Sequence, residues 1–179
     1  AANIAVAKKI REYLNQKNYQ KLLLVADGNT WRVLGEKTEK MLTQGGKDVR
    51  TVLLGGEEVV PDEQTIFQVL YQAGAEERAY LAVGTGTVTD ITRFCAHRTR
   101  SPFISLPTAP SVDGFTSPSC SLSIKRVKTT VTAKPPEAIF ADLDVLCAAP
   151  QKMIAAGFGD ILGKSIALAD WHLGRLLWD

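Results

Sequence analysis

The stretch YLAVGTGTVTD, residues 80–90, is an apolar run that ends in a Gly-x-Gly turn and continues into helix-forming sequence. Continuous apolar runs of this length are typical of strands buried on both faces, as in parallel sheets. Glycine lets the backbone turn sharply and approach a phosphate closely, and the N-terminus of a helix offers unpaired N–H groups. The stretch therefore predicts a strand at 80–83, a phosphate-binding turn at 84–90 and a helix at 88–97.

A Gly-x-Gly turn has two interpretations, because a tight strand-to-helix turn without a ligand needs the same glycines. The turn is neither a GxGxxG fingerprint nor a Walker motif, since no Gly-Lys-Ser/Thr follows. Its position after a third strand–helix repeat, at the carboxyl end of a buried strand, favours a ligand. Asp27 occupies a comparable strand end, where an acid holds adenosine ribose or simply caps a helix. Both alternatives stay open for Asp27.

Strands and helices alternate on both sides of this stretch. Short links between them predict right-handed βαβ units and an α/β, Rossmann-like, mostly parallel sheet. We expect helices at 4–18 (with Ile4, Val6, Ile10 and Leu14 on one face), 30–44 and 61–75, with Ile66, Val69 and Leu70 facing inward in the last. The expected strands are 22–26, 49–54, 80–83 and 103–106, and Gly45-Gly46 is expected to end the second helix.

The pattern changes after Ser111. Residues 119–132 alternate and are rich in Ser and Thr, which predicts a β-hairpin arm, and residues 138–141 predict a short core strand. Pro150 marks a boundary, and 153–178 reads as helix. We expect residues 1–149 to form a dinucleotide-binding α/β domain, with 150–179 the first helix or helices of an all-α metal and substrate domain.

Composition limits the function classes. Of 179 residues, 45% are hydrophobic and 22% are charged, and the net charge of +2 comes without a basic stripe interleaved with aromatics, so we expect no nucleic acid. No apolar run approaches the ~20 residues of a membrane span. Charges at 8, 9 and 11 interrupt any signal peptide, so a cytoplasmic location is expected. Cys95, Cys120 and Cys147 form no CxxC pair and are expected to be reduced core or near-core residues.

Four segments together resemble one family. They are VADGNT (25–30), the 84–90 turn, SLPTAPSVDGFTS (105–117) and AGFGDILGK (156–164). In this order they resemble sn-glycerol-1-phosphate dehydrogenases, within the superfamily of metal-dependent polyol dehydrogenases, iron-type alcohol dehydrogenases and 3-dehydroquinate synthase. The resemblance covers essentially the whole chain. One departure is Thr85, which stands where the superfamily usually has the middle glycine of Gly-Gly-Gly.

The resemblance implies reversible hydride transfer between NAD(P)H and dihydroxyacetone phosphate, with a divalent metal (zinc or nickel) polarising the reacting oxygen. It implies that Asp113 contacts the substrate, and that Asp160 binds both metal and substrate; both would be catalytic. Dinucleotide contacts are implied for the glycine turn, for Asp27 at the adenosine end and for a loop towards the nicotinamide. These residues are Asp27, Gly84, Gly86, Thr87, Val88, Thr89, Asp90, Thr108, Ala109, Pro110, Ser111 and Ser117.

The metal site is incomplete in this sequence. A catalytic metal usually takes three protein ligands, and the family supplies two histidines downstream of its aspartate. Only His97 and His172 occur here, and His172 lies roughly 18 Å along one helix from Asp160, so both are assigned to structure or surface. Asp160 sits between glycines, where we expect a helix to start, and an N-cap is its alternative role. We therefore expect an N-terminal part of a larger enzyme that is inactive alone.

Several alternatives stay open. The parent enzyme is a glycerol-1-phosphate dehydrogenase, another glycerol or polyol dehydrogenase, or a 3-dehydroquinate synthase-like enzyme; a non-catalytic nucleotide-binding module is the reading of another class. Asp27 favours NAD over NADP, and Arg32 offsets that preference. A phosphorylated triose or glycerol is the expected substrate. We also expect a homo-oligomer, because an apolar helix face at 161, 162, 166 and 168 promotes self-association.

Overall fold

Five parallel strands form the central sheet, in the spatial order β2-β1-β3-β4-β7. The computed structural model describes residues 2–56 and 58–178. The strands are β1 (Lys21–Asp27), β2 (Asp48–Leu54), β3 (Ala79–Gly84), β4 (Phe103–Pro107) and β7 (Ala138–Ile139). Every pairing in this sheet is parallel, which confirms the predicted α/β fold class.

β1 and β3 lie in the middle of the sheet and are buried on both faces, as their continuous apolar sequences predict. In β1, Leu22 and Leu24 pack into one hydrophobic cluster, whereas Leu23 and Val25 pack into a second cluster on the opposite face. Alternate side chains of a strand point to opposite faces, so an unbroken apolar run supplies both layers of the core.

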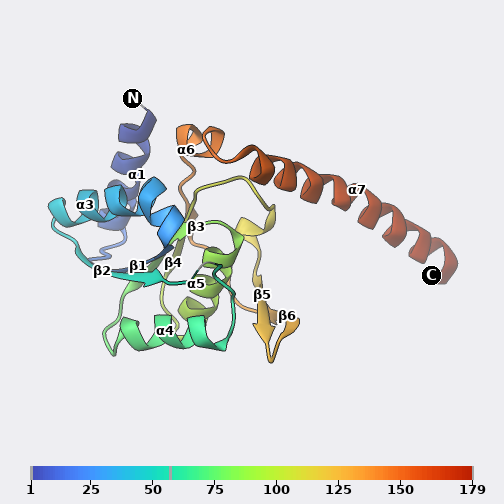
Figure 1. The fold of residues 1–179 in the computed structure, drawn as a ribbon, viewed down its shortest axis with the longest axis horizontal. Helices are drawn as coiled ribbons and strands as arrows, with labels where there is room; N and C mark the ends of the chain where they lie inside the picture. Colours follow the sequence, from blue (N-terminus) through green and yellow to red (C-terminus); the bar gives the residue numbers. More distant parts are fainter. Residues whose placement is uncertain (1, 57, 179) are drawn as a thin grey trace.

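Helices cover both faces of the sheet (Figure 1). On one face lie α1 (Ala2–Gln16) and α3 (Glu36–Gln44), which contribute Ile10, Leu14 and Leu42 to the first cluster. On the other face lie α4 (Glu63–Ala73) and α5 (Gly86–Arg98), which contribute Val69 and Ile91 to the second. The expected inward residues Ile66 and Leu70 also pack there; the side chain of Ile4 lies outside the described residues.

The predicted helix 30–44 is divided into three segments. They are α2 (Gly28–Thr30), a π-helical turn η1 (Trp31–Gly35) and α3. The Trp31 ring lies against Gly35, where a Cβ would stand 2.6 Å from the ring atom Cε3. Gly45 caps the end of α3 and Gly46 has φ of +81°, so the predicted stop is confirmed.

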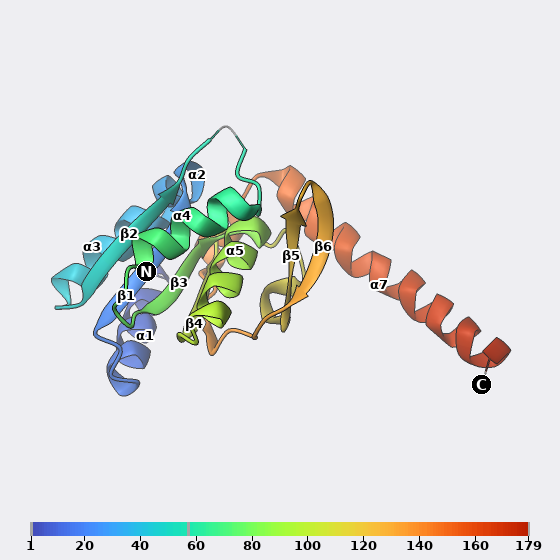
Figure 2. The same cartoon turned by 90° about the horizontal axis from the view of Figure 1, so that it is seen from below.

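The predicted hairpin arm is also present, as β5 (Ser119–Ile124) paired antiparallel with β6 (Val127–Thr132). Lys125 and Arg126 turn the chain with φ of 50° and 65°, the twist that two-residue hairpin turns require. Cys120 and Leu122 of β5 pack against Phe94 of α5. Figure 2 shows the arm beside α5, between the sheet and the long C-terminal helix.

A short helix α6 (Leu143–Cys147), which the sequence analysis missed, leads into α7 (Gln151–Trp178). α7 runs away from the sheet, and Gly157 is the one buried residue among those described in it (Figure 1). Within residues 2–56 and 58–178, no helix is long and apolar enough to cross a membrane.

The cysteine prediction holds for two of the three residues. Cys95 and Cys120 are buried, and burial raises the pKa of their thiols to about 12 and about 11, so both stay protonated. Cys147 is exposed at the end of α6, so the prediction of a core or near-core position is wrong for that residue. The error arose because the sequence analysis missed α6, in which Cys147 is the last residue and is exposed to solvent.

Candidate active site at the carboxyl edge of the sheet

The strand order reverses between β1 and β3. The connection after β1 covers one face of the sheet, whereas α5 after β3 covers the other. Helices that leave neighbouring strands in opposite directions open a crevice at the carboxyl ends of those strands, where ligands of α/β proteins bind. Asp27 and Gly84 end these two strands, so two of the predicted site residues flank the crevice.

The two glycines of the turn have different surroundings. A Cβ at Gly84 would lie 2.6 Å from Cβ of Val88, so Gly84 lets α5 pack directly against the end of β3. At Gly86 the nearest atom to an added Cβ would be a methyl of Val112 at 3.5 Å, which is an ordinary contact. Packing within the described chain therefore requires glycine at 84 and accepts a side chain at 86.

The N-terminus of α5 lacks a side-chain cap. Thr85 is its N-cap residue and makes no capping hydrogen bond, whereas Asp27 and Asp62 both cap the helices that follow them. The first N–H groups of a helix have no partner within the helix, and together they attract an anion. The backbone of Gly86, Thr87 and Val88 thus forms an anion-accepting end at the crevice.

Other side chains of the predicted turn are turned into the protein. Val88 and Thr89 are buried, and the Thr89 hydroxyl has no hydrogen-bond partner among the described residues. Asp90 accepts from the backbone N–H of Ser121 at 3.0 Å and pairs with Arg93 at 3.0 Å. Burial raises the pKa of Asp90, although both partners favour its carboxylate. Asp90 therefore holds the hairpin arm onto α5.

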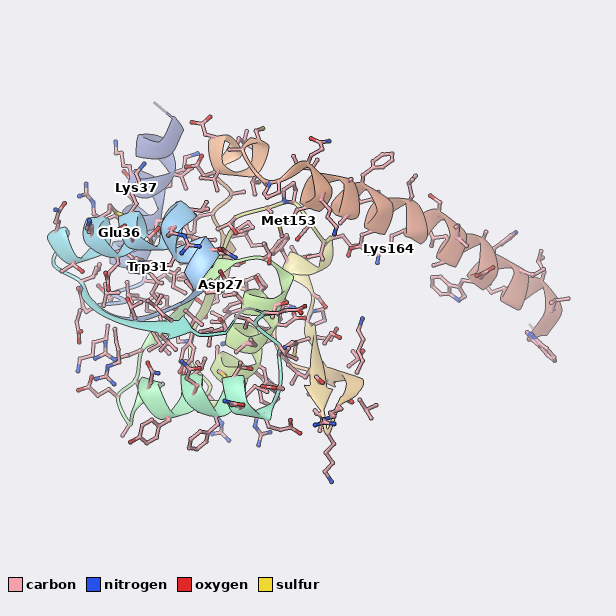
Figure 3. The ribbon with its side chains drawn as sticks, viewed as in Figure 1. Asp27, Trp31, Glu36, Lys37, Met153 and Lys164 are labelled. Atoms are coloured by element: carbon pink, nitrogen blue, oxygen red, sulfur yellow. The ribbon has the colours of Figure 1, made fainter. Side chains whose placement is uncertain are left out.

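Asp27 caps the helix that follows β1. Its Oδ1 accepts from the N–H groups of Asn29 and Thr30, both at 2.8 Å, and the Thr30 hydroxyl accepts from the Asp27 N–H at 3.1 Å. The capping role left open by the sequence is therefore real. Oδ2 accepts no hydrogen bond among the described residues. Figure 3 shows Asp27 at this edge, with Met153 of α7 above it.

A cavity of about 610 Å³ lies beside Asp27, between three parts of the chain. Its walls come from the turn after β1, the loop after β4 and the α6–α7 junction. It contains two of the predicted dinucleotide residues, Thr108 and Ala109. The lining residues are Asn29, Arg32, Val33, Thr108, Ala109, Asp144, Val145, Ala148, Ala149, Pro150 and Met153. An apolar cavity with a few polar groups on its wall suits a flat, partly polar ligand.

Arg93 organises the loop that carries the other predicted residues, and the sequence analysis did not identify it. Its side chain is 1% exposed. The guanidinium donates to the carbonyls of Gly114, Phe115 and Ser119 at 2.9, 2.9 and 2.6 Å. These bonds fix the short 3-10 helix η2 (Gly114–Thr116) against α5. The spacing of Asp90 and Arg93, three residues apart on one helix, was the only signal in the sequence.

Ser117 follows η2 and is engaged within the same loop. Its hydroxyl accepts from the N–H of Ser119 at 3.0 Å and lies 2.9 Å from the Ser119 hydroxyl. Pro110 and Ser111 stand earlier in the loop, where α7 crosses it. A Cβ at Gly157 would lie 1.8 Å from the Pro110 carbonyl oxygen, so only glycine allows this close approach.

The crossing brings the two predicted acids together. The backbone N–H of Asp113 donates to Oδ2 of Asp160 at 2.9 Å, and Nζ of Lys164 lies 3.1 Å from Oδ2 of Asp113. The hydrogen bond from Asp113 is the main cause that lowers the pKa of Asp160, and the ion pair with Asp113 raises that of Lys164. Lys164 follows Asp160 by four residues in α7, so the two side chains share one face of the helix. The sequence analysis did not single it out.

Asp160 does not start a helix. α7 begins at Gln151, so Asp160 lies well inside it, and the N-cap alternative is wrong. The flanking glycines suggested a turn, but Gly157 serves the close approach to Pro110. His97 lies in the last turn of α5, and His172 is exposed on α7. The described residues contain no group of three side chains able to hold a metal ion, so Asp160 alone does not make a metal site.

Comparison with known proteins identifies the family. The model of the iron-containing alcohol dehydrogenase family matches residues 2–150. The chain belongs to this family. A glycerol-1-phosphate dehydrogenase [NAD(P)+] of Bacillus subtilis is 45% identical over 174 residues, which are 96% of this chain and 44% of the relative. The chain thus spans less than half the length of that relative.

Solved structures share the fold. Glycerol dehydrogenase from Schizosaccharomyces pombe superposes with a TM-score of 0.78 at 25% identity, over 88% of this chain and 40% of that one. A 2-deoxy-scyllo-inosose synthase, solved with carbaglucose-6-phosphate, NAD+ and Co2+, gives 0.76 at 20% identity, over 86% and 45%. At 20% identity, the likeness to the synthase bears only on the α/β fold of the chain.

Proposed function

We propose that this chain is the dinucleotide-binding half of an NAD(P)-dependent glycerol-1-phosphate dehydrogenase, which reduces dihydroxyacetone phosphate to sn-glycerol 1-phosphate. The observation that carries the proposal is the uncapped N-terminus of α5 at the point where the strand order reverses, beside a cavity of about 610 Å³. The 45% identity to a glycerol-1-phosphate dehydrogenase supports the substrate.

In this proposal the pyrophosphate rests on the N–H groups of the first turn of α5, from Gly86 to Val88. The adenosine occupies the cavity, where Thr108 and Ala109 line one wall, and Oδ2 of Asp27 accepts from a ribose hydroxyl. The loop from Pro110 to Ser117 leads towards the nicotinamide. Thr89 and Asp90 contribute by holding the turn, since their side chains face the protein.

The substrate end is proposed around Asp113 and Asp160. A divalent metal, zinc or nickel, would be a Lewis acid for the carbonyl oxygen of the substrate. The described residues hold no group of three ligands for such a metal. We propose that Asp160 supplies one ligand, and that the remaining ligands lie in the part of the relatives that this chain does not cover. The chain alone would then bind dinucleotide without turnover.

The same division explains α7. Ile161, Leu162, Ile166 and Leu168 are 52–67% exposed, and large apolar faces of this kind mark surfaces that another part of a protein covers. We propose that residues 150–179 begin an all-α domain after a dinucleotide-binding domain at 1–149, and that the protein forms a homo-oligomer.

The substitution Gly86→Ala tests the dinucleotide site. A methyl group there meets only Val112, at an ordinary contact distance, but it enters the space in front of the α5 N–H groups. We expect affinity for NADH, measured by calorimetry, to fall roughly tenfold or more, as for losing one hydrogen bond to a charged group. Thr99→Ala, at the opposite end of α5, is the matched control.

Unchanged NADH affinity in Gly86→Ala, with an unchanged melting temperature, would show that the α5 terminus is not the pyrophosphate site. Two separate assays of this chain, with dihydroxyacetone phosphate and NADH and with glycerol and NAD+, test the division of labour. Measurable turnover by these 179 residues would contradict the incomplete metal site.

A further inference from the structure

Arg32 is the one cationic residue among the described residues that line the cavity beside Asp27. It belongs to η1, directly after the turn that follows β1. Its Nη2 donates to Oδ1 of Asn29 at 2.6 Å, and Asn29 lines the same cavity. The bond holds the guanidinium at the part of the wall that Asn29 lines, two residues after Asp27.

The guanidinium keeps donor capacity in this position. Arginine has five N–H donors in a planar fork, and the bond to Asn29 uses one of them. A fork with unused donors is suited to two parallel hydrogen bonds with a phosphate group. Arg32 is exposed, so such a group reaches it without displacing any side chain that packs in the core.

Acids near Arg32 limit what the cavity accepts. Asp27 keeps one oxygen for a ribose hydroxyl, and its other oxygen is neutralised in part by two backbone N–H groups. Asp144 lines the cavity from a different wall, on α6 with Val145 and Ala148. A ribose with a free 2′-hydroxyl therefore suits Asp27 at the end of β1, whereas a 2′-phosphate needs a cation, which Arg32 supplies five residues later on the wall of the cavity.

We propose that Arg32 forms a subsite for the 2′-phosphate of NADP(H), so that one cavity accepts both nicotinamide dinucleotides. The subsite rests on the proposed dinucleotide function, because the adenosine must lie in this cavity. Asp27 binds the free 2′-hydroxyl of NAD(H), and Arg32 binds the 2′-phosphate of NADP(H). Asn29 acts as a positioning residue that holds the guanidinium at the wall.

Calorimetric titrations of the chain with NADPH, NADH and adenosine 2′,5′-bisphosphate test the subsite. We expect Arg32→Ala to weaken NADPH and the bisphosphate tenfold or more, and to change NADH affinity less than about threefold, since hydrogen bonds to charged groups are worth about a tenfold change or more each. Asn29→Ala is expected to give a smaller loss in the same direction, because the guanidinium remains but is no longer held.

Lys40→Ala is the matched control, because it removes one positive charge from the adjacent helix α3 without touching the cavity. It should leave both affinities and their ratio unchanged. If Arg32→Ala weakens NADPH and NADH equally, or neither, the subsite is overturned while the dinucleotide site stands. If the unsubstituted chain binds NADH but not NADPH, the subsite is likewise overturned. If it binds no dinucleotide at all, the proposed function fails together with the subsite.

Discussion

β3 and α7 are both rich in apolar residues, but they have opposite environments. All six residues of β3 are buried, whereas α7 has 28 residues, of which the structure buries only Gly157 among those it describes. β3 lies between two strands and beneath helices of the same chain. α7 touches the domain at its first turns and then extends away from it (Figure 2).

The difference shows which apolar residues are buried by other parts of the same chain and which are not. A helix with apolar residues on all sides is normally buried in a larger core. The sheet packs against helices of the same chain on both faces. The crevice at its carboxyl edge is formed where β1 and β3 lie side by side. The end of the crevice formed with α7 brings the carboxylates of Asp113 and Asp160 together, but the described residues contain no group of three metal ligands there. The proposed dinucleotide end can therefore be tested on this chain alone.

The largest expected effect on stability comes from breaking the contact between Arg93 of α5 and the loop at residues 114–119. Arg93→Met leaves three backbone carbonyls and the half-buried Asp90 without their guanidinium partner. We expect a loss of about 3–5 kcal/mol in the free energy of unfolding, measured with urea. Arg98→Met, on the exposed end of the same helix, is the control. A loss below about 1 kcal/mol would contradict the organising role of Arg93.

A paired substitution tests the contrast between sheet and α7 directly. Leu24→Ala removes a fully buried side chain from β1 and should cost about 2–5 kcal/mol of unfolding free energy. Ile166→Ala removes a side chain that is 67% exposed and should change it by less than about 0.5 kcal/mol. Equal losses would mean that α7 packs against something in solution, and analytical ultracentrifugation would then show whether that is a second copy.

Local patterns in the sequence predicted the parts of the fold that depend on neighbours in the chain. The apolar run before Gly84 predicted β3, and the alternation at 119–132 predicted the hairpin. α6 was missed because its five residues are too few to show a helical period. The prediction that a helix starts at Asp160 was wrong, because the nearby glycines suggested a turn. Gly157 instead allows α7 to approach the carbonyl of Pro110 closely.

The candidate site was predictable in composition but not in its contacts. The resemblance placed Asp113 and Asp160 at one site, and the structure brings them together across 47 positions of sequence. No local pattern shows that the backbone N–H of Asp113 is the donor, or that Lys164 reaches the Asp113 carboxylate. The sequence showed only the pairing of Arg93 with Asp90, because the three carbonyls that Arg93 holds lie 21–26 positions away.

The two glycines of the turn between β3 and α5 give the next smaller effect. Gly84→Ala places a methyl against Val88 at a distance that no pair of carbon atoms adopts, so β3 and α5 must separate. We expect a loss of about 1–3 kcal/mol in unfolding free energy, typical of overpacking a core. Gly86→Ala should be nearly neutral in the same urea titration. Similar losses at both glycines would indicate that Gly86 has a structural role as well.

The smallest expected effect is at the opposite edge of the sheet. Arg78, 5% exposed, pairs with Asp48 at 3.0 Å and with Glu76 at 2.7 Å. Hydrogen bonds from Arg78 are the main cause that lowers the pKa of both carboxyls. A carboxyl with a lowered pKa in the folded state contributes stability above its unfolded pKa, and this stability is lost as the pH falls through the folded value.

Unfolding free energy should therefore decline as the pH drops from about 5 towards 2, as acid protonates the two carboxylates. Glu76→Gln removes one of the titrating partners and should make this decline shallower, with little change near pH 7 because the Glu76 side chain is 49% exposed and Arg78 keeps its ion pair with Asp48. Glu12→Gln, in an exposed ion pair on α1, provides the comparison. An acid limb of unchanged slope in Glu76→Gln would assign the acid sensitivity to other carboxyls. Because this edge lies away from the crevice, NADH affinity should be the same in both variants.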